Sequence, residues 1–192
     1  MDKQQLKSLL MEAGVVQRGQ FTLKSGEISS FYIDVRRAIS YPQLLRAMAQ
    51  MMWATVAQTS PIVPLQRVCG VPYGALPVTT CISVDQNLPM ILCRKDAKLY
   101  GTKKKIEGVY QPGQNCLVVE DVMTTGSSLL GTIECLEASG LIVKEAVVLV
   151  DREQGGAQLL QNSGYQLHRV FTLDTLLDKR CVREGLSTSV DA

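Results

Sequence analysis

The chain has few histidines, little net charge and no long apolar run, and each shortage excludes a class of protein. One histidine, His168, is present in 192 residues, which excludes a histidine-rich metal centre and disfavours a Ser-His-Asp triad. The net charge is +2, so bulk electrostatics do not favour nucleic-acid or membrane-surface binding. No apolar stretch approaches membrane-spanning length, and the N-terminus lacks a signal-peptide core. We therefore expect a cytoplasmic protein that binds neither nucleic acid nor membranes.

Two further motifs are missing. The six cysteines form no Cys-x-x-Cys pair, so we interpret them as reduced core residues and not as disulfides or metal ligands. The sequence also contains no Gly-x4-Gly-Lys-Ser/Thr and no Gly-x-Gly-x-x-Gly, which disfavours an enzyme acting on nucleoside triphosphates or dinucleotides.

The length and the apolar pattern indicate one α/β domain. A chain of 192 residues with 46% hydrophobic residues can bury a sizeable core. Apolar residues recur at helical spacing over residues 3–13 and 41–58, whereas residues 145–150 form a strand-like segment in which Glu145 is followed by a continuous apolar run. Because strands and helices alternate through the middle of the chain, the pattern predicts a parallel sheet with crossover helices.

The most informative stretch runs from Cys116 to Ser128. It begins with apolar, β-branched residues, continues with the acidic pair Glu120-Asp121, and ends in Thr-Thr-Gly-Ser-Ser before a helical pattern that stops near Gly140. Small residues at a helix N-terminus can place backbone N–H groups around a phosphate. Carboxylates accept hydrogen bonds from ribose hydroxyls and attract a divalent cation. The combination favours a ribose-phosphate site, and the alternative is an ordinary turn with a capped helix and a solvated acidic pair.

This stretch resembles the phosphoribosyl pyrophosphate (PRPP) signature of the type I phosphoribosyltransferases. Between Phe21 and Arg169 the order of further segments resembles the orotate phosphoribosyltransferases, including those fused to a decarboxylase. The resemblance implies the type I fold, with a parallel central sheet flanked by helices and a small hood. It implies a single domain over residues 1–180, a hood largely from residues 15–40 and the C-terminal strands, and a tail or linker over residues 181–192.

The implied activity is transfer of phosphoribose from PRPP to orotate, giving orotidine 5′-monophosphate and pyrophosphate in UMP biosynthesis, with Mg²⁺ as cofactor. The resemblance implies no direct protein ligand for Mg²⁺, which PRPP would hold, with water-mediated contact to Glu120 or Asp121. A decarboxylase for the product is an expected fusion or complex partner. A purine phosphoribosyltransferase and a non-catalytic PRPP sensor are the alternatives. A purine enzyme has no need of the Phe31-Tyr32 pair together with Arg152, and a sensor needs no intact cationic lid.

The resemblance also assigns roles to individual residues. Catalysis is assigned to Lys98, Arg94 and Asp121. Orotate binding is assigned to Lys24, Phe31, Tyr32, Thr124 and Arg152. PRPP binding is assigned to the following residues: Lys24, Tyr73, Gly74, Arg94, Lys95, Lys98, Tyr100, Glu120, Asp121, Val122, Met123, Thr124, Thr125, Gly126, Ser127 and Ser128.

Residues 94–108 form the most basic stretch of the chain, with glycines on both sides of its lysine run. The composition indicates a loop, and a solvated charged loop is the simplest interpretation of Lys103 to Lys105. The resemblance instead implies a catalytic lid shared across a homodimer, whose cations stabilise the leaving pyrophosphate. The sequence departs from the family pattern at Gly74, where many members have lysine, and at Tyr100, where many have histidine.

Overall fold

The computed structural model describes residues 1–22, 28–59, 64–94 and 105–177. A six-stranded sheet runs through the centre in the order β5-β4-β3-β6-β7-β8. Its strands are β3 (Arg67–Gly70), β4 (Met90–Cys93), β5 (Ile106–Glu107), β6 (Cys116–Met123), β7 (Glu145–Asp151) and β8 (Gln166–Thr172). All neighbouring strands are parallel except β4 and β5. The structure therefore confirms the predicted α/β class.

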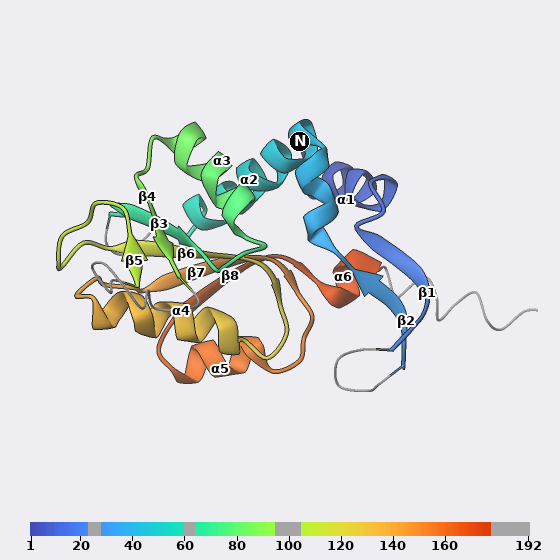
Figure 1. The fold of residues 1–192 in the computed structure, drawn as a ribbon. Helices are drawn as coiled ribbons and strands as arrows, with labels where there is room; N and C mark the ends of the chain where they lie inside the picture. The colour runs from blue at the N-terminus through green and yellow to red at the C-terminus, as the bar shows by residue number, and fades with distance from the viewer. Residues whose placement is uncertain (23–27, 60–63, 95–104, 178–192) are drawn as a thin grey trace, which may run out of the picture.

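Helices cover both faces of this sheet (Figure 1). The helices α2 (Pro42–Ala57) and α3 (Leu76–Gln86) pack on one face, while α4 (Ser127–Ala138) and α5 (Gly156–Asn162) pack on the other. Successive residues of a strand point to opposite faces. Leu117 and Val119 of β6 accordingly join the α2–α3 core, and Cys116 and Val118 join the α4–α5 core. Burial on both faces explains why these strands are continuous apolar runs.

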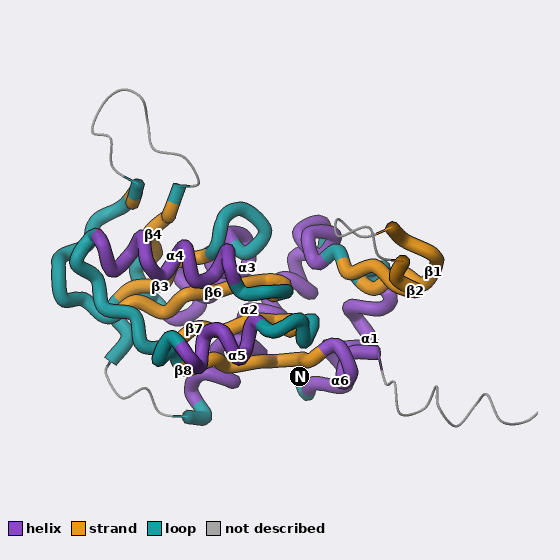
Figure 2. The backbone as a smooth tube through the Cα atoms, turned by 90° about the horizontal axis from the view of Figure 1, so that it is seen from below, coloured by secondary structure: helices purple, strands orange, loops and turns teal. Residues whose placement is uncertain are grey.

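The hood stands apart from the sheet. It consists of the antiparallel strands β1 (Val16–Thr22) and β2 (Ile28–Ile33), preceded by α1 (Lys3–Glu12) and followed by the short 3₁₀ helix η1 (Val35–Ser40). A capping box starts α1, because the Asp2 carboxylate accepts from the Gln5 N–H at 2.8 Å and the Gln5 side chain accepts from the Asp2 N–H at 3.0 Å. The hood lies beside the edge where the parallel strands end (Figures 1 and 2).

From the sequence we expect the C-terminal strands to contribute to the hood, but the described C-terminal part contacts the hood through a helix. The last strand, β8, pairs with β7 in the main sheet and adds no strand to the hood. It is the helix α6 (Leu173–Leu177) that approaches α1, where the Lys7 ammonium donates a hydrogen bond to the Thr175 carbonyl at 2.9 Å. In the described ranges no helix is long and apolar enough to cross a membrane.

Candidate active site

The loop from Thr124 to Gly126 connects β6 to α4 at the carboxyl edge of the sheet. Its carbonyls are held by the next unit of the chain: the Arg152 N–H donates to Met123 at 2.9 Å, and the Gly156 N–H donates to Thr124 at 3.2 Å. Gly126 has a φ of +81°, which favours glycine. A Cβ there would lie 3.1 Å from Cα of Gly156. The loop is thus clamped between β6 and the start of α5.

A small cavity of about 40 Å³ lies inside this loop. The Thr125 and Ser127 hydroxyls lie 2.9 Å apart and hydrogen-bond to each other. The first N–H groups of α4 have no acceptor within the helix and carry the positive end of its dipole, so the cavity suits an anionic tetrahedral group. The following residues line it: Glu120, Val122, Met123, Thr124, Thr125, Gly126, Ser127, Ser128 and Leu129.

The acidic pair is divided between the two faces of the sheet. Glu120 is buried and lines the cavity inside the loop from Thr124 to Gly126. Its carboxylate accepts a hydrogen bond from the Asp121 N–H at 3.0 Å. Asp121 faces the turn after β3, because a Cβ added at Gly74 would lie 2.9 Å from the Asp121 Cγ. The two carboxylates therefore serve different neighbours, which adjacency in the sequence did not indicate.

The turn after β3 brings a second backbone segment to the same edge. It contains a cis peptide bond between Pro72 and Tyr73, and the Tyr73 side chain is 66% exposed. Gly74 packs directly on the Asp121 carboxylate. Many members of the resembled family have lysine at this position. In this backbone any side chain at position 74 would displace Asp121, which gives a physical reason for glycine here.

Arg152 follows β7. Its backbone N–H hydrogen-bonds to the Met123 carbonyl, which places Arg152 next to the loop from Thr124 to Gly126. Its Nε is buried and has no hydrogen-bond partner among the described residues. A buried donor left unsatisfied is costly, so this atom marks a place where an acceptor is missing. The neighbouring Asp151 is fully buried and is occupied elsewhere, accepting from the Glu153 N–H at 2.9 Å and from Arg169 at 3.4 Å.

The two hood aromatics point in different directions. Phe31 packs against the α2 side of the core, whereas the Tyr32 ring contacts Phe21 with ring centroids 5.6 Å apart. Adjacent residues of a strand face opposite ways, so the structure does not bring both rings to one wall. Both Tyr32 and Asp121 act electrostatically on Arg36, which follows the second hood strand.

Arg36 is a residue that the sequence reasoning missed. It follows β2 in η1, and its guanidinium pairs with Asp34 at 2.6 Å. Hydrogen bonding and charge from Asp34 raise the pKa of Arg36, and Tyr32 and Asp121 add to this rise. Its only sequence signal was an arginine close after the predicted hood strands.

Arg94 is the one residue with an assigned role in the predicted lid that lies within the described ranges. Its N–H donates to the Lys105 carbonyl at 2.9 Å, and its guanidinium pairs with Glu107 of β5 at 3.0 Å. The two ends of the 94–108 segment are therefore joined at the sheet edge. The predicted ligands Lys24, Lys95, Lys98 and Tyr100 lie outside the described residues.

His168 lies away from these groups, in the sheet interior. It hydrogen-bonds Glu145 at 2.7 Å, and both side chains are almost fully buried. Within the described ranges no group of three or more His, Cys, Asp or Glu side chains is placed to hold a metal ion.

Comparison with known proteins places these features in a family. Residues 68–163 match the family model of the phosphoribosyl transferase domain. The chain is 48% identical over 166 residues to uridine 5′-monophosphate synthase of Bos taurus, covering 86% of this chain and 34% of that protein. It is 40% identical over 170 residues to orotate phosphoribosyltransferase of Chlamydia caviae, covering 88% of this chain and 81% of that protein.

A solved structure agrees. Mycobacterium tuberculosis orotate phosphoribosyltransferase in complex with PRPP superposes with a TM-score of 0.73 at 29% identity, covering 92% of this chain and 99% of that one. The chain spans about a third of the length of the bovine synthase and most of the chlamydial and mycobacterial proteins. The fold, the segment that matches the family model and the similarity over most of the chlamydial protein all indicate the same family. The chain therefore belongs to the orotate phosphoribosyltransferase family of phosphoribosyl transferase domains.

Proposed function

We propose that this chain transfers the phosphoribosyl group of PRPP to N1 of orotate, giving orotidine 5′-monophosphate and pyrophosphate in UMP biosynthesis. The observation that carries the proposal is the buried, unpartnered Nε of Arg152 beside the phosphate loop. Orotate differs from other pyrimidines by a carboxylate, and an arginine fork binds carboxylates in a bidentate way.

The phosphate loop binds the 5′-phosphate in this proposal. Backbone N–H groups from Val122 to Ser128, the hydroxyls of Thr125, Ser127 and Ser128, and the α4 dipole surround it. The loop cavity and its two hydrogen bonds to the Arg152 and Gly156 N–H groups support this role, because the loop is shaped before the ligand arrives. Preorganised donors lose little on binding.

The acidic pair binds the ribose and, through water, Mg²⁺. Asp121 and Glu120 lie at the end of β6, and ribose hydroxyls donate to carboxylates. Mg²⁺ keeps several waters and prefers phosphate oxygens, so PRPP itself supplies most of its ligands. When bound, the ion neutralises charge that develops on the departing pyrophosphate. These carboxylates also favour the positive charge that develops at C1 of the sugar.

Orotate lies between the hood and the phosphate loop. Arg152 binds its carboxylate, Tyr32 and Phe31 contribute from the hood, and Thr124 and Lys24 donate hydrogen bonds. The electrostatic action of both Tyr32 and Asp121 on Arg36 supports a place for that ring beside the site. Phe31 contributes indirectly, because its packing against the core holds the hood strand that carries Tyr32.

Cations bind the leaving pyrophosphate. Arg94, Lys95, Lys98 and Tyr100 come from the lid, Lys24 comes from the hood, and the backbone around Tyr73 and Gly74 supplies N–H donors. Arg94 is held by a half-exposed ion pair with Glu107, and such a pair contributes under about 1 kcal/mol. Arg94 can therefore exchange Glu107 for pyrophosphate at little cost.

The chemistry needs no protein nucleophile. The bond between C1 and the pyrophosphate oxygen loosens, pyrophosphate departs with the bonding electrons, and orotate N1 bonds to C1 from the opposite face. The proton of orotate N1 passes to the departing pyrophosphate. Lys98 is the main catalytic residue, with Arg94 and Asp121, because it neutralises the leaving charge. Positioning and fixed electrostatics supply the rate enhancement.

A homodimer that shares the 94–108 segment is part of the proposal. Exposed apolar side chains lie on the turn after β3, on α3 and on β4: Tyr73 is 66%, Val84 71% and Leu92 39% exposed. Large exposed apolar residues on neighbouring elements favour an interface. Because the chain spans about a third of the bovine synthase, a decarboxylase domain fused to it or bound to it is also proposed.

The proposal is tested by following the near-ultraviolet absorbance of orotate with the purified chain, PRPP and Mg²⁺. We expect the signal to fall only when all components are present and to be nearly abolished in Lys98→Ala. Turnover of adenine or hypoxanthine without turnover of orotate would assign the chain to the purine class. PRPP binding without turnover of any base would favour a sensor.

A further inference from the structure

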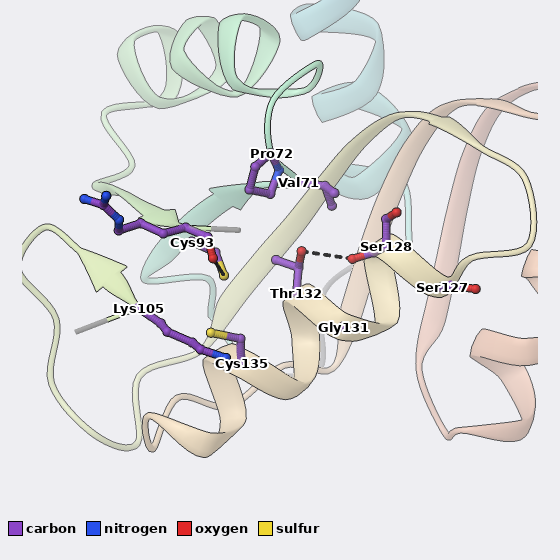
Figure 3. A pocket seen from close by; sticks show the side chains of 10 residues that line it. Val71, Pro72, Cys93, Lys105, Ser127, Ser128, Gly131, Thr132 and Cys135 are labelled. Carbon is purple, nitrogen blue, oxygen red and sulfur yellow. Dashed lines mark hydrogen bonds between the residues drawn. The ribbon is translucent and has the colours of Figure 1, made fainter. Parts of the chain in front are cut away.

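A second cavity, of about 210 Å³, lies between the end of β4 and the exposed side of α4 (Figure 3). Two cysteines from segments far apart in the sequence line it, Cys93 as the last residue of β4 and Cys135 in α4. The full lining is as follows: Val71, Pro72, Cys93, Arg94, Lys105, Ser127, Ser128, Gly131, Thr132 and Cys135.

The two thiols face each other in this cavity. Figure 3 shows both sulfur atoms directed into the space between strand and helix. After burial, Cys135 is the neighbour that acts most strongly on the pKa of the Cys93 thiol, and both side chains pack in the same apolar cluster. Cys93 is 8% exposed, and Cys135 is half-buried and forms part of the open cavity wall. A solvent-connected cavity with two facing thiols differs from ordinary core packing of cysteine, which seals the sulfur from solvent.

The two sulfur atoms differ in burial, and this difference gives them different roles in oxidation. Burial raises the pKa of the Cys93 thiol to about 12, and the hydrogen bond and charge of Cys135 act in the same direction, while the Lys105 ammonium lowers it. Cys93 therefore stays protonated near neutral pH. Cys135 is the more accessible sulfur and is the one that an external oxidant reaches first.

We propose that Cys93 and Cys135 form a redox-active dithiol that a peroxide converts to an intrachain disulfide. The Cys135 thiolate attacks one oxygen of hydrogen peroxide, the O–O bond breaks, and a sulfenic acid and, after protonation, one water result. The Cys93 sulfur attacks the sulfenic sulfur and forms the S–S bond. The departing hydroxide takes the Cys93 proton and leaves as a second water, so two thiols and one peroxide become one disulfide and two waters.

The disulfide joins two parts of the active site. Its S–S bond of about 2.05 Å is much shorter than a thiol hydrogen bond, so the end of β4 and the helix α4 must move toward each other. Arg94 follows Cys93 directly, and α4 begins with Ser127 and Ser128. This consequence rests on the proposed function, in which these residues bind PRPP. Oxidation should therefore raise the KM for PRPP to several times that of the reduced protein.

The test treats the reduced full-length chain with hydrogen peroxide, blocks remaining thiols by alkylation and measures the intact mass. We expect one pair of cysteines to resist alkylation and to be recovered by dithiothreitol. Cys93→Ser and Cys135→Ser should abolish the protected pair. Cys81→Ser and Cys116→Ser, which change cysteines outside the cavity lining, should keep it. Trypsin places Cys93 in residues 68–94, together with Cys69 and Cys81, and Cys135 in residues 106–144, together with Cys116. A linked pair of these peptides identifies the bond once fragmentation separates Cys93 from Cys81 and Cys69, and Cys135 from Cys116.

Two results would overturn the proposal. One is a chain in which Cys135 is oxidised past the sulfenic acid with no link to Cys93. The other is a link that survives in Cys93→Ser or Cys135→Ser, which would place it on Cys69 or another cysteine. A fully linked chain with an unchanged KM for PRPP would overturn the coupling to the phosphate loop. The mass measurement needs no turnover, so failure of the proposed reaction is distinguishable from failure of the disulfide.

Discussion

At the scale of single residues, the site depends on side chains that touch one another across segments. Asp121 illustrates this dependence, because its carboxylate is bounded by a glycine 47 positions earlier, Gly74, with a Cβ-to-Cγ distance of only 2.9 Å for any added side chain. A side chain added at position 74 would therefore have to displace this carboxylate. The glycine therefore acts through the position of Asp121, whatever contacts its own N–H makes with pyrophosphate.

Gly74→Ala should lower kcat/KM for PRPP by roughly 10- to 100-fold, because a displacement of about 1 Å at a reacting group has effects of this size. Steady-state kinetics with varied PRPP measure the change. Gly131→Ala is the matched control, because a Cβ at Gly131 meets open space within a helix and should stabilise the fold by about 0.5–1 kcal/mol. Equal kinetics for the two variants would show that the turn does not position Asp121.

At the scale of elements, the loop between β6 and α4 is built from both of its neighbours. The Arg152 and Gly156 N–H groups bind its carbonyls, and Gly126 lies against Gly156 and Leu160 of α5. Two consecutive strand–helix units therefore share one junction. Its shape should depend on small residues at the contact and not only on the Thr-Thr-Gly-Ser-Ser sequence.

Gly126→Ala should weaken PRPP binding and lower the melting temperature by about 3–8 °C, which corresponds to roughly 1–2 kcal/mol of left-handed strain before the contact with α5 is added. Gly164→Ala is the control, since its φ is +84° and nothing lies within 4 Å of an added Cβ. Calorimetry and PRPP titration of both variants separate strain from contact. A Gly126→Ala protein that melts with the control and binds PRPP normally would contradict a rigid junction.

At the scale of the whole molecule, the main strands and helices of the sheet layer follow from local sequence patterns. The buried runs of β6 and β7 and the amphipathic stretches of α1 and α2 were all predicted, and a loop connects β6 to α4 at the Thr-Thr-Gly-Ser-Ser stretch, as the sequence indicated. Each of these signals is contained in one window of sequence. Parallel strands then bring their carboxyl ends to one edge without further information.

Features that depend on distant partners were not predicted. The two-residue strand β5 exists because Glu107 and Ile106 pair with β4, and within a lysine-rich loop it has no periodicity of its own. Strand alternation turns Phe31 toward the core and Tyr32 toward Phe21, and the assignment of both rings to orotate binding did not distinguish their directions. The Gly74–Asp121 and Cys93–Cys135 contacts join residues from different strand–helix units, and no local pattern indicates such pairs.

The assembly of hood, phosphate loop and Arg152 into one orotate site is the central claim, and substrate discrimination by an Arg152 variant tests it most directly. The measurement is kcat/KM for orotate and for uracil, which lacks the carboxylate, in the wild type and in Arg152→Gln. We predict that Arg152→Gln lowers the value for orotate by about 100-fold, as loss of a charged hydrogen-bonded pair does. The KM for PRPP and the melting temperature should stay nearly constant, so the preference for orotate over uracil largely disappears. A variant that keeps its preference for orotate would contradict the account.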